Sequence, residues 1–325
     1  TLGDKLSRQL QEDVAPKMSD EEAFSFAGFN AEDAERGGYS DYSYWKSTLR
    51  AFFQNKIAVF FLFVMVAVLL FTFIQPYLPG QKDPILIHND QWGLPLNNIP
   101  PSKEFWFGTN SIGQDLWARI WAGTRTSLFI GFSVALVEAV VGILVGVLWG
   151  YVRQLDFFFT ELYNIINSVP QIIYMTLIAL MIGQSFTIMC VSLIAFHWLV
   201  MARNVRNLVM IYRDREFNLA SRTLGTPIYR ILVKNLLPQL VSVIILRLAL
   251  SIPGTINMET TLSYLGLGLD INTPSLGILL RNARAYFLDY PYLLIFPAII
   301  VSIITITFYL IGNAFSDASD PRNHV

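Results

Sequence analysis

The chain has 325 residues, of which 54% are hydrophobic and only 14% are charged, and its mean hydropathy is +0.47. This composition excludes an ordinary soluble domain and is typical of membrane proteins. The net charge of −1 gives no indication of a nucleic-acid partner, and the single cysteine, Cys190, excludes an intramolecular disulfide and a cysteine-based metal site.

The first 50 residues are rich in acidic side chains. They contain no basic start followed by a short apolar run and a small-residue cleavage site, which a secretory signal would require. Segments of this composition bury too little apolar surface to fold by themselves. We therefore expect an acidic, partly disordered cytosolic tail over residues 1–50.

Residues 57–74 form an apolar run that is long enough to cross a bilayer, which takes about 20 residues. Lys46, Arg50 and Lys56 precede this run, so the positive-inside rule places its start in the cytosol. The sequence therefore predicts a first transmembrane helix within residues 51–76.

Residues 77–126 are then expected outside the cell. This stretch is rich in proline and aromatic residues, which suits a compact region at the membrane interface. Residues 115–125, at its end, predict a short interfacial helix. The side chains expected on the membrane surface are Leu116, Trp117, Ile120 and Trp121.

Five further apolar segments follow, at residues 127–151, 163–183, 185–200, 239–262 and 293–315. Six crossings that begin in the cytosol also end there, so both termini, including a tail at residues 316–325, are predicted to be cytosolic. The same parity places residues 201–235 in the cytosol, in agreement with their many basic side chains. These are Arg203, Arg206, Arg213, Arg215, Arg222, Arg230 and Lys234. The sequence therefore predicts an all-α integral membrane protein with six transmembrane helices.

A few polar residues lie inside the predicted spans. A charge near the centre of a bilayer costs roughly 2.5 to 3.5 kcal/mol even on insertion scales, so such residues are expected to face the bundle or a wet path. The candidates for a translocation path are Glu138, Asn167, Gln171 and Arg247. For Glu138 and Arg247, a structural ion pair or snorkelling towards the interface is the alternative. His197 has no second ligand at a matching spacing, so we interpret it as packed or hydrogen-bonded and predict no metal site.

Two patterns concern the backbone of the spans. Pro170 lies among polar residues and predicts a broken or kinked third span, which is tolerable only where protein or water satisfies the freed backbone groups. Gly142 and Gly146 form a small-xxx-small pattern, which indicates close packing against another helix.

Residues 213–238 form a basic amphipathic stretch between two long apolar segments. Phe217, Ala220 and Leu224 are three and four residues apart, so they share one apolar face of a short helix. The basic side chains expected to face water are Arg213, Arg215 and Arg222.

A glycine corner is predicted after this helix. Gly225 ends it, and Thr226 followed by Pro227 is a start signal, with a capping hydroxyl and a proline at the first helical position. The apolar residues expected to line the second short helix are Ile228, Ile231 and Leu232.

This helix pair resembles the EAA loop of ABC importer permeases, in which Glu-Ala-Ala precedes a glycine and, about ten residues later, Ile/Leu-Leu-Pro. The matching positions here are Leu219-Ala220-Ser221, Gly225 and Leu236-Leu237-Pro238. The resemblance implies contact with an ATPase, with Glu216 in place of the missing acidic residue. The implied coupling residues are Glu216, Phe217, Ala220, Ser221, Leu224 and Gly225. A helix pair that lies on the bilayer surface is the alternative.

A second resemblance lies in the external region. Residues 107–115 read Phe-Gly-Thr-Asn-Ser-Ile-Gly-Gln-Asp, and residues 123–128 read Gly-Thr-Arg-Thr-Ser-Leu. They resemble the Gly-Thr-Asp, x-x-Gly-Arg-Asp and Gly-x-Arg-x-Ser-Leu signature of the peptide and nickel branch of ABC permeases. Asn110 and Gln114 depart from the aspartate and arginine of that signature.

Three segments in the C-terminal third, residues 259–268, 273–277 and 317–322, resemble the end of C-type subunits of oligopeptide and dipeptide importers. The acidic tail and the Asn-Leu-Ala-Ser-x-Thr-Leu-Gly form of the loop look most like Gram-positive systems. The resemblance implies the ABC type I importer permease fold, with its core at residues 127–315, in a bacterial plasma membrane.

The same resemblance implies the partners: a homologous B-type permease, two ATPase subunits that hold ATP and Mg, an extracytoplasmic peptide-binding lipoprotein, a peptide substrate and membrane lipid. We expect no cofactor and no enzymatic activity in this chain, because it contains neither a phosphate-binding loop nor a hydrolase signature. The alternatives are a nickel permease of the same family and a secondary transporter, which is expected to show inverted repeats.

Overall fold

The computed structural model describes residues 44–270 and 272–319, so most of the tails predicted at residues 1–50 and 316–325 lies outside the described residues. Residues 316–319 of the second tail belong to α15 instead. The chain divides into residues 1–47 and residues 48–325, and the architecture below is that of the second unit. Within the described residues there is no strand, and three isolated bridges occur in the loop that precedes α6. The prediction of an all-α protein is confirmed.

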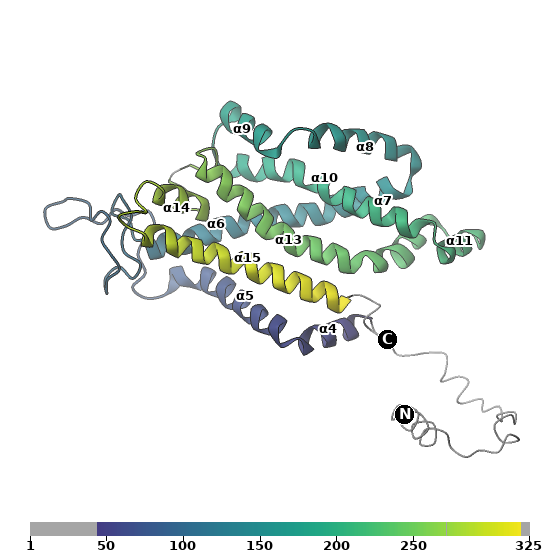
Figure 1. Ribbon diagram of the computed structural model, residues 1–325, viewed down its shortest axis with the longest axis horizontal. Helices are drawn as coiled ribbons and strands as arrows, with labels where there is room; N and C mark the ends of the chain where they lie inside the picture. Colours follow the sequence, from purple (N-terminus) through teal and green to yellow (C-terminus); the bar gives the residue numbers. More distant parts are fainter. Residues whose placement is uncertain (1–43, 271, 320–325) are drawn as a thin grey trace, which may run out of the picture. The chain divides into compact units, whose positions relative to one another are not determined.

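The helices follow one another with short connections, except for the long loop between α5 and α6 (Figure 1). They are α4 (Tyr44–Gln54), α5 (Lys56–Ile74), the 3-10 turn η1 (Gln75–Tyr77), α6 (Leu116–Val137), the π-helix η2 (Glu138–Gly142), α7 (Ile143–Tyr151), α8 (Arg153–Asn167), α9 (Gln171–Ile182), α10 (Phe186–Arg213), α11 (Glu216–Thr223), α12 (Ile228–Arg230), the π-helix η3 (Ile231–Leu236), α13 (Leu237–Tyr264), α14 (Leu276–Ala283) and α15 (Tyr292–Ser319).

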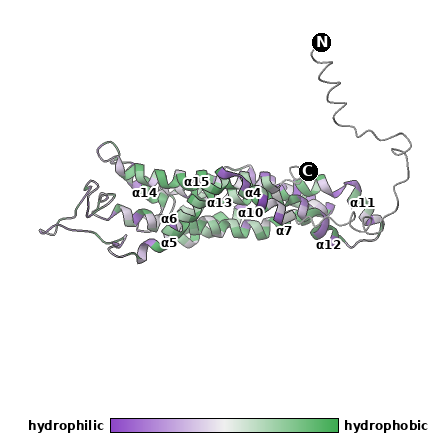
Figure 2. Cartoon of the chain, turned by 90° about the horizontal axis from the view of Figure 1, so that it is seen from below, coloured by the Kyte–Doolittle hydropathy of each residue, from purple (hydrophilic) through white to green (hydrophobic). Residues whose placement is uncertain are grey.

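Within residues 44–270 and 272–319, five helical segments are long and apolar enough to cross a membrane, and each overlaps a predicted span. They are Lys56–Tyr77, Leu116–Tyr151, Phe186–Arg213, Val243–Tyr264 and Tyr292–Ser319. Figure 2 shows apolar residues along the middle of these helices and hydrophilic residues near α11 and α12. At 1.5 Å per residue a helix such as α10 or α15 is about 42 Å long, which exceeds the roughly 30 Å hydrocarbon core of a bilayer.

The remaining predicted span, residues 163–183, is two helices. The axes of α8 and α9 differ by 74° at a break that contains Pro170, so the predicted kink is confirmed. Proline lacks an N–H and disfavours helical geometry in the residue before it, which ends α8. With 12 residues, α9 is about 18 Å long and too short to cross a bilayer alone. Together, α8 and α9 return the chain from the end of α7 to the start of α10 (Figure 1).

An ion pair holds α8 against α10. Asp156 accepts hydrogen bonds of 2.8 Å from both Nε and Nη2 of Arg206, and one of 2.9 Å from Nε1 of Trp149 at the end of α7. This bidentate geometry is the strong form of an arginine–carboxylate contact. α8 contains no fully buried residue, but Phe159, Tyr163 and Ile166 pack against the cluster of Trp149, Leu199 and Ala202. The contact of Asp156 and this packing together hold α8 in place.

Two helix boundaries differ from the prediction. Residues 115–125 are not a separate interfacial helix, because they are the N-cap and first turns of α6, and Leu116 and Ile120 are buried against α14 and α15. Asp115 accepts a backbone N–H of this first turn, and burial raises the pKa of its carboxyl. Residues 44–50, which were expected in the tail, belong to α4.

Glycines on α7 and η2 allow close contact with α10, as predicted. A Cβ atom on Gly142 would lie 2.7 Å from Cβ of Met201, and one on Gly146 would lie 2.5 Å from the carbonyl oxygen of Ala202. Gly150 continues the same face one turn later. Small residues at such an interface let two backbones approach, which is how membrane helices gain packing energy.

Glu259, which is fully buried, connects α6, α13 and α14. Its carboxylate accepts hydrogen bonds from the hydroxyls of Ser127, Ser263 and Ser275 at 3.0, 2.8 and 2.8 Å. Ser127 in turn accepts the N–H of Leu276, the first residue of α14. A buried carboxylate is tolerable only when its oxygens have partners, so this network fixes α14 against the two longer helices.

Two glycines with positive φ shape the loop between α5 and α6. A Cβ atom on Gly108 (φ +79°) would overlap the carbonyl oxygen of Ile99, and one on Gly113 (φ +80°) would lie 3.0 Å from the carbonyl oxygen of His88. Tyr292, at the start of α15, places its Oη 3.0 Å from the same oxygen of Ile99. The glycines of the signature are therefore required both by backbone conformation and by space.

The two departures from that signature contact each other. Nδ2 of Asn110 donates a 2.9 Å hydrogen bond to Oε1 of Gln114, and both side chains are buried. Arg119 also donates to Oε1 of Gln114. A neutral amide pair therefore stands where the signature has an acid and an arginine, and it avoids the cost of taking two charges out of water.

The packing of α7 on α10 generates a stability prediction. Gly146→Ala is expected to lower the free energy of unfolding by about 1–3 kcal/mol, because the added methyl group meets backbone that cannot move aside. Thermal unfolding of the detergent-solubilised protein measures the change. Gly254→Ala on α13 is the matched control, because no heavy atom lies within 4 Å of its Cβ position and alanine favours the helix. Equal stability of the two variants would contradict the proposed contact.

Candidate functional site

Two asparagines, the buried Asn218 and the half-buried Asn235, hold α11 at the end of the bundle where α10 ends and α13 begins (Figure 1). Asn218 is fully buried, and its Nδ2 donates a 2.8 Å hydrogen bond to the carbonyl oxygen of Tyr212. Its Oδ1 accepts a 3.1 Å hydrogen bond from Nδ2 of Asn235, which also lies 3.2 Å from Oγ of Ser221. Because a buried amide must be satisfied, these contacts decide which face of α11 turns inward.

Two of the three arginines expected in water also hold α11 in place, so that prediction is wrong for them. Nη2 of Arg222 donates to the carbonyl oxygen of Arg213 at 3.1 Å, and its guanidinium lies 5.1 Å from the ring centroid of Tyr151. Arg213 donates to the carbonyl oxygen of Gly150 at 2.8 Å. Carbonyls at helix ends lack helical partners, and long basic side chains reach them. Among the three, only Arg215 is exposed.

The glycine corner forms as predicted. Gly225 has φ +76°, its N–H donates to the carbonyl of Arg222 at 2.9 Å, and the N–H of Thr226 donates to that of Ser221 at 3.0 Å. These two bonds make a Schellman motif. No heavy atom lies within 4 Å of the Cβ position, so conformation rather than space favours glycine. The expected cap by Thr226 is wrong, because Pro227 is the N-cap of α12 and no side chain caps that helix.

The opposite side of α11, which we call the α11 outer face, is open to solvent in this chain. Its exposed members among the predicted coupling residues are Glu216, Phe217, Ala220, Leu224 and Gly225. Phe217 is 46% exposed and Leu224 is 84% exposed. Ser221 lies on the inner side instead, where its Oγ donates to the carbonyl oxygen of Phe217. Phe217 and Leu224 therefore leave apolar side chains open to solvent on this face.

The second predicted helix is the first turn of a longer one. α12 runs through the π-helix η3 directly into α13. Ile231 and Leu236 are fully buried in a cluster with Val209 of α10, whereas Ile228 and Tyr229 are exposed. The α11 outer face therefore borders a chain segment that continues without interruption into a membrane helix.

A cavity of about 240 Å³ brings together three of the four predicted path residues. Glu138, Asn167 and Gln171 line it, together with His197 of α10 and Ser251 of α13. The break between α8 and α9 places Asn167 and Gln171 at its wall, because the helix ends there and the side chains on both sides of the break face the same space. The break between α8 and α9 therefore explains why the third predicted span contains polar residues.

Glu138 is held at one edge of this cavity. It begins the π-helix η2, a widened turn of a kind that occurs often at functional sites. The hydroxyl of Ser251 donates a short hydrogen bond to Oε2 of Glu138. The residue is only 7% exposed. Its other carboxylate oxygen has no hydrogen-bond partner among the residues that the structure describes.

His197 is hydrogen-bonded, as we interpreted it from the sequence. Its Nδ1 lies 2.9 Å from the carbonyl oxygen of Leu193 and 3.4 Å from Nε2 of Gln171. A carbonyl oxygen can only accept, so the shorter contact places the ring proton on Nδ1 and leaves Nε2 as an acceptor. In the part of the chain that the structure describes, no group of three His, Cys, Asp or Glu side chains is arranged to hold a metal ion.

Arg247 is the one path candidate that the structure places elsewhere. It precedes Ser251 by one turn on α13, yet its side chain is exposed and does not line the cavity. It makes no ion pair within the described residues, so the structural pair considered for it is not formed there. Helical side chains lean towards the helix N-terminus, which carries this guanidinium towards the α11 end, as expected for a snorkelling arginine.

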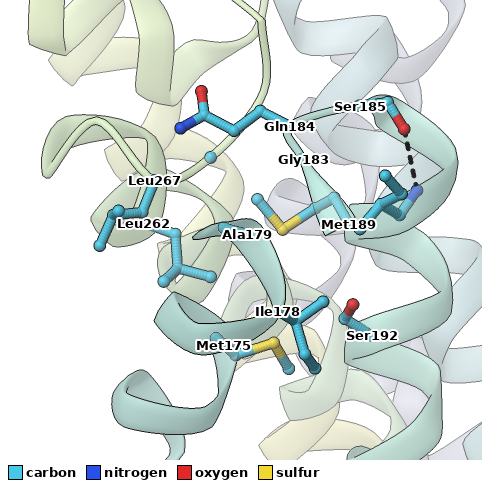
Figure 3. A pocket seen from close by; sticks show the side chains of 12 residues that line it. Met175, Ile178, Ala179, Gly183, Gln184, Ser185, Met189, Ser192, Leu262 and Leu267 are labelled. Atoms are coloured by element: carbon cyan, nitrogen blue, oxygen red, sulfur yellow. Dashed lines mark hydrogen bonds between the residues drawn. The ribbon is translucent and has the colours of Figure 1, made fainter. Parts of the chain in front are cut away.

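A second cavity, near the start of α10, is about 20 Å³ and holds no more than one water (Figure 3). Figure 3 shows Met175 and Met189 in its wall, with Gln184 beside them. Nε2 of Gln184 donates to the carbonyl oxygen of Gly266 at 2.8 Å, and Ser185 accepts an N–H of the first turn of α10. These contacts join two loops, so we interpret this cavity as structural.

Sequence reasoning missed the polar residues that position both sites. For Asn218 a signal was present, because it lies three and four residues before Ser221 and Arg222, so polar positions repeat along a second face of α11. Asn235 and Ser251 gave no comparable signal. The acceptor of Ser251 lies 113 residues earlier in the chain, and only the folded structure brings the two together.

Comparison with known proteins agrees with this architecture. Residues 142–325 match the family described as binding-protein-dependent transport system inner membrane component, and residues 43–101 match the N-terminal TM domain of oligopeptide transport permease C. The chain is 35% identical to the oligopeptide transport system permease protein AmiD of Streptococcus pneumoniae, over 94% of this chain and 98% of that protein. It is 32% identical to the dipeptide transport system permease protein DppC of Lactococcus lactis (92% and 97% covered) and 31% identical to the oligopeptide transport system permease protein OppC of Bacillus subtilis (92% and 96% covered).

The first of these matches covers more than half of the chain, from the last residue of η2 onwards, and includes the α11 outer face and α13. The relatives cover nearly all of it at more than 30% identity. This chain therefore belongs to the family of binding-protein-dependent transport system inner membrane components, and it has the type I ABC importer permease fold.

Proposed function

We propose that this chain is the membrane-spanning permease subunit of an ATP-driven importer that moves oligopeptides delivered by an extracytoplasmic binding protein. The observation that supports this most directly is its relation, at 31–35% identity along nearly its whole length, to oligopeptide and dipeptide transport permeases. ATP and Mg are proposed to bind to two partner ATPase subunits, and a homologous B-type permease completes the path.

The α11 outer face is the proposed contact with an ATPase. Phe217 and Leu224 are exposed while Asn218 behind them is fully buried, so the face is held in one orientation before any partner binds. A preorganised surface loses less conformational entropy on binding. Glu216, in the first turn of α11, supplies the acidic group that is missing at Leu219.

Alternating access is the proposed mechanism. When the ATPases close on ATP, they push the α11 outer face. The displacement reaches η3 through the hydrogen bonds that Asn235 makes to Asn218 and Ser221, and η3 continues into α13. α13 carries Ser251, which contacts Glu138 at the cavity. The cavity is thus proposed as part of the translocation path, connected to the coupling surface by one continuous helix.

The α11 end of the bundle is proposed to face the cytosol of a bacterial plasma membrane. Basic residues concentrate at this end, as the positive-inside rule requires, and both termini are proposed to lie on that side. They are Arg203, Arg206, Arg213, Arg215, Arg222, Arg230 and Lys234, with Arg50 before α5 and Lys56 at its start. The loop between α5 and α6, at the opposite end, would then receive the binding protein.

Two alternatives are less well supported. The relatives with nearly full coverage are named as oligopeptide or dipeptide permeases, which favours peptide over nickel as substrate. A secondary transporter would need no preorganised apolar face at the end of α11, and the family is one of binding-protein-dependent systems.

The first functional prediction concerns the energy source. Purified alone, this chain is expected neither to bind nor to hydrolyse ATP. Proteoliposomes that contain it with its B-type partner, two ATPases and the binding protein are expected to accumulate labelled peptide only with ATP and Mg. Peptide uptake driven by an ion gradient in vesicles without ATPases would decide for the secondary transporter, and uptake of nickel alone would decide for the other alternative.

The second prediction concerns coupling through α11. Ala220→Asp buries an unpaired charge in the proposed contact, so peptide uptake should fall by more than about tenfold while capture of peptide by the binding protein is unchanged. Gly225→Val is expected to have a similar effect, because a β-branched residue in the left-handed region costs roughly 1–2 kcal/mol. Copurification of the ATPases and uptake by the reconstituted assembly measure both variants.

The matched controls are Ala220→Ser, which adds no charge, and Gly225→Asn, which tolerates positive φ. Both are expected to retain most of the uptake. Arg222 is unsuitable as a control for a water-facing residue, because its side chain contacts α7 and α10. If Ala220→Asp and Gly225→Val assemblies keep their ATPases and transport at the unmutated rate, α11 is a passive surface helix.

The third prediction concerns topology. Ser102 and Asn272 are exposed in loops at the end of the bundle opposite α11. Single cysteines in their place are expected to react with an impermeant thiol reagent on intact cells. A cysteine in place of Thr223, which is exposed on α11, is expected to react only after the membrane is opened. Background labelling is expected to be low, because Cys190 is buried. Labelling of the Thr223 position from outside would reverse the proposed orientation.

A further inference from the structure

We propose that the cavity at Glu138 binds a primary ammonium group of the peptide in transit, either its N-terminus or a lysine side chain. This inference rests on the proposed function and adds the chemistry that the permease itself recognises. The site is distinct from the one on the binding protein, because it lies between membrane helices of this chain.

The first argument is the charge of the lining. Glu138 is the only carboxylate among the residues that line the cavity, and no lysine or arginine lines it. The other polar groups, which include the amides of Asn167 and Gln171, are neutral. A cavity with one acidic group in a low-dielectric surrounding attracts a cation and repels an anion.

The second argument is how the carboxylate is presented. Ser251 fixes Oε2 of Glu138, and the π-turn of η2 holds the residue at the cavity edge. The other oxygen has no hydrogen-bond partner among the described residues, although only 7% of the residue is exposed. A buried carboxylate without a full set of partners is costly, and an ammonium group removes that cost because it donates up to three hydrogen bonds.

The third argument is that nearby cations do not occupy the site. The guanidinium of Arg203 lies 4.2 Å from the ring centroid of Tyr163, and its Nη1 points to Asn164, outside the cavity. Arg247 is exposed and makes no contact with Glu138 in the described part of the chain. The position opposite the free carboxylate oxygen is therefore available to a ligand.

The fourth argument is space. No heavy atom lies within 4 Å of the Cβ position of Gly254, which lines the cavity three residues after Ser251. The cavity measures about 240 Å³, whereas sites for drug-sized molecules usually measure roughly 300 to 1,000 Å³. It accommodates one end or one side chain of a peptide rather than a whole oligopeptide. Recognition would thus depend on a single group and tolerate varied sequences.

The experiment uses the complete assembly in proteoliposomes with ATP and loaded binding protein. Three peptides of matched sequence are compared: one with a free N-terminus and no lysine, one N-acetylated without lysine, and one N-acetylated with a single lysine. Capture by the binding protein is measured separately, and uptake is expressed per loaded binding protein. Uptake of all three by the unmutated assembly establishes the proposed function independently of Glu138.

Glu138→Gln keeps the size of the side chain and removes its charge. It is expected to reduce uptake of the peptides that carry an ammonium group by about tenfold, as for loss of a charged hydrogen bond, and to change uptake of the neutral peptide by less than about twofold. A loss for the free N-terminus alone or for lysine alone identifies which source of ammonium the cavity takes. The matched control, Glu161→Gln on the exposed side of α8, is expected to have no effect.

Gly254→Leu tests the cavity by filling it, and it is expected to reduce uptake of all three peptides equally. The inference is overturned if Glu138→Gln leaves all three rates unchanged or lowers them equally while ATPase subunits still copurify. Failure of the unmutated assembly to take up any of the peptides would instead overturn the proposed function, so the two failures are distinguishable.

Discussion

Polar groups that lie within a bilayer must find their partners inside the protein, because lipid offers none. Three polar contacts lie along one helix, and the first two are made by residues of its apolar segment, Val243–Tyr264. Glu259, near the end of α13, accepts hydrogen bonds from three serines, and Ser251, farther back, donates to Glu138. Asn235, just before α13 begins, donates to Asn218 of α11. The end of the bundle that carries α14, the cavity and the α11 outer face are thus all connected to α13, and α6, α9, α10, α14 and α15 pack against it.

The contrast between the first two of these contacts separates structure from transport. Glu259 is fully buried and both of its carboxylate oxygens accept hydroxyl hydrogen bonds, so it presents no unpaired oxygen to a ligand. Glu138 has one such hydroxyl and a cavity beside it. Two carboxylates of the same chain therefore have different roles because of the number of donors around them. A fully satisfied network rigidifies, whereas a partly satisfied one is poised to accept a partner.

Much of this could be predicted from the sequence, because hydrophobic length and glycine placement act locally. The five long helices, the break at Pro170 and the corner at Gly225 all follow from one stretch of chain at a time. The inward contacts of Arg213 and Arg222 could not be predicted, since their acceptors are carbonyls at the ends of other helices. The size of the break at Pro170, 74°, could not be predicted either, because it depends on what α8 and α9 pack against.

Pro253 makes the long helix α13 easier to bend at one position. It stands inside the helix, between Ser251 and Gly254, where it removes one backbone hydrogen bond and crowds the preceding turn. Gly254 beside it has no side chain to brace against neighbouring atoms. α13 is therefore expected to bend most easily at the cavity when a force acts on its α11 end. The half of α13 that follows Pro253 is held by the contacts of Glu259, so it can stay still while the half that precedes Pro253 moves.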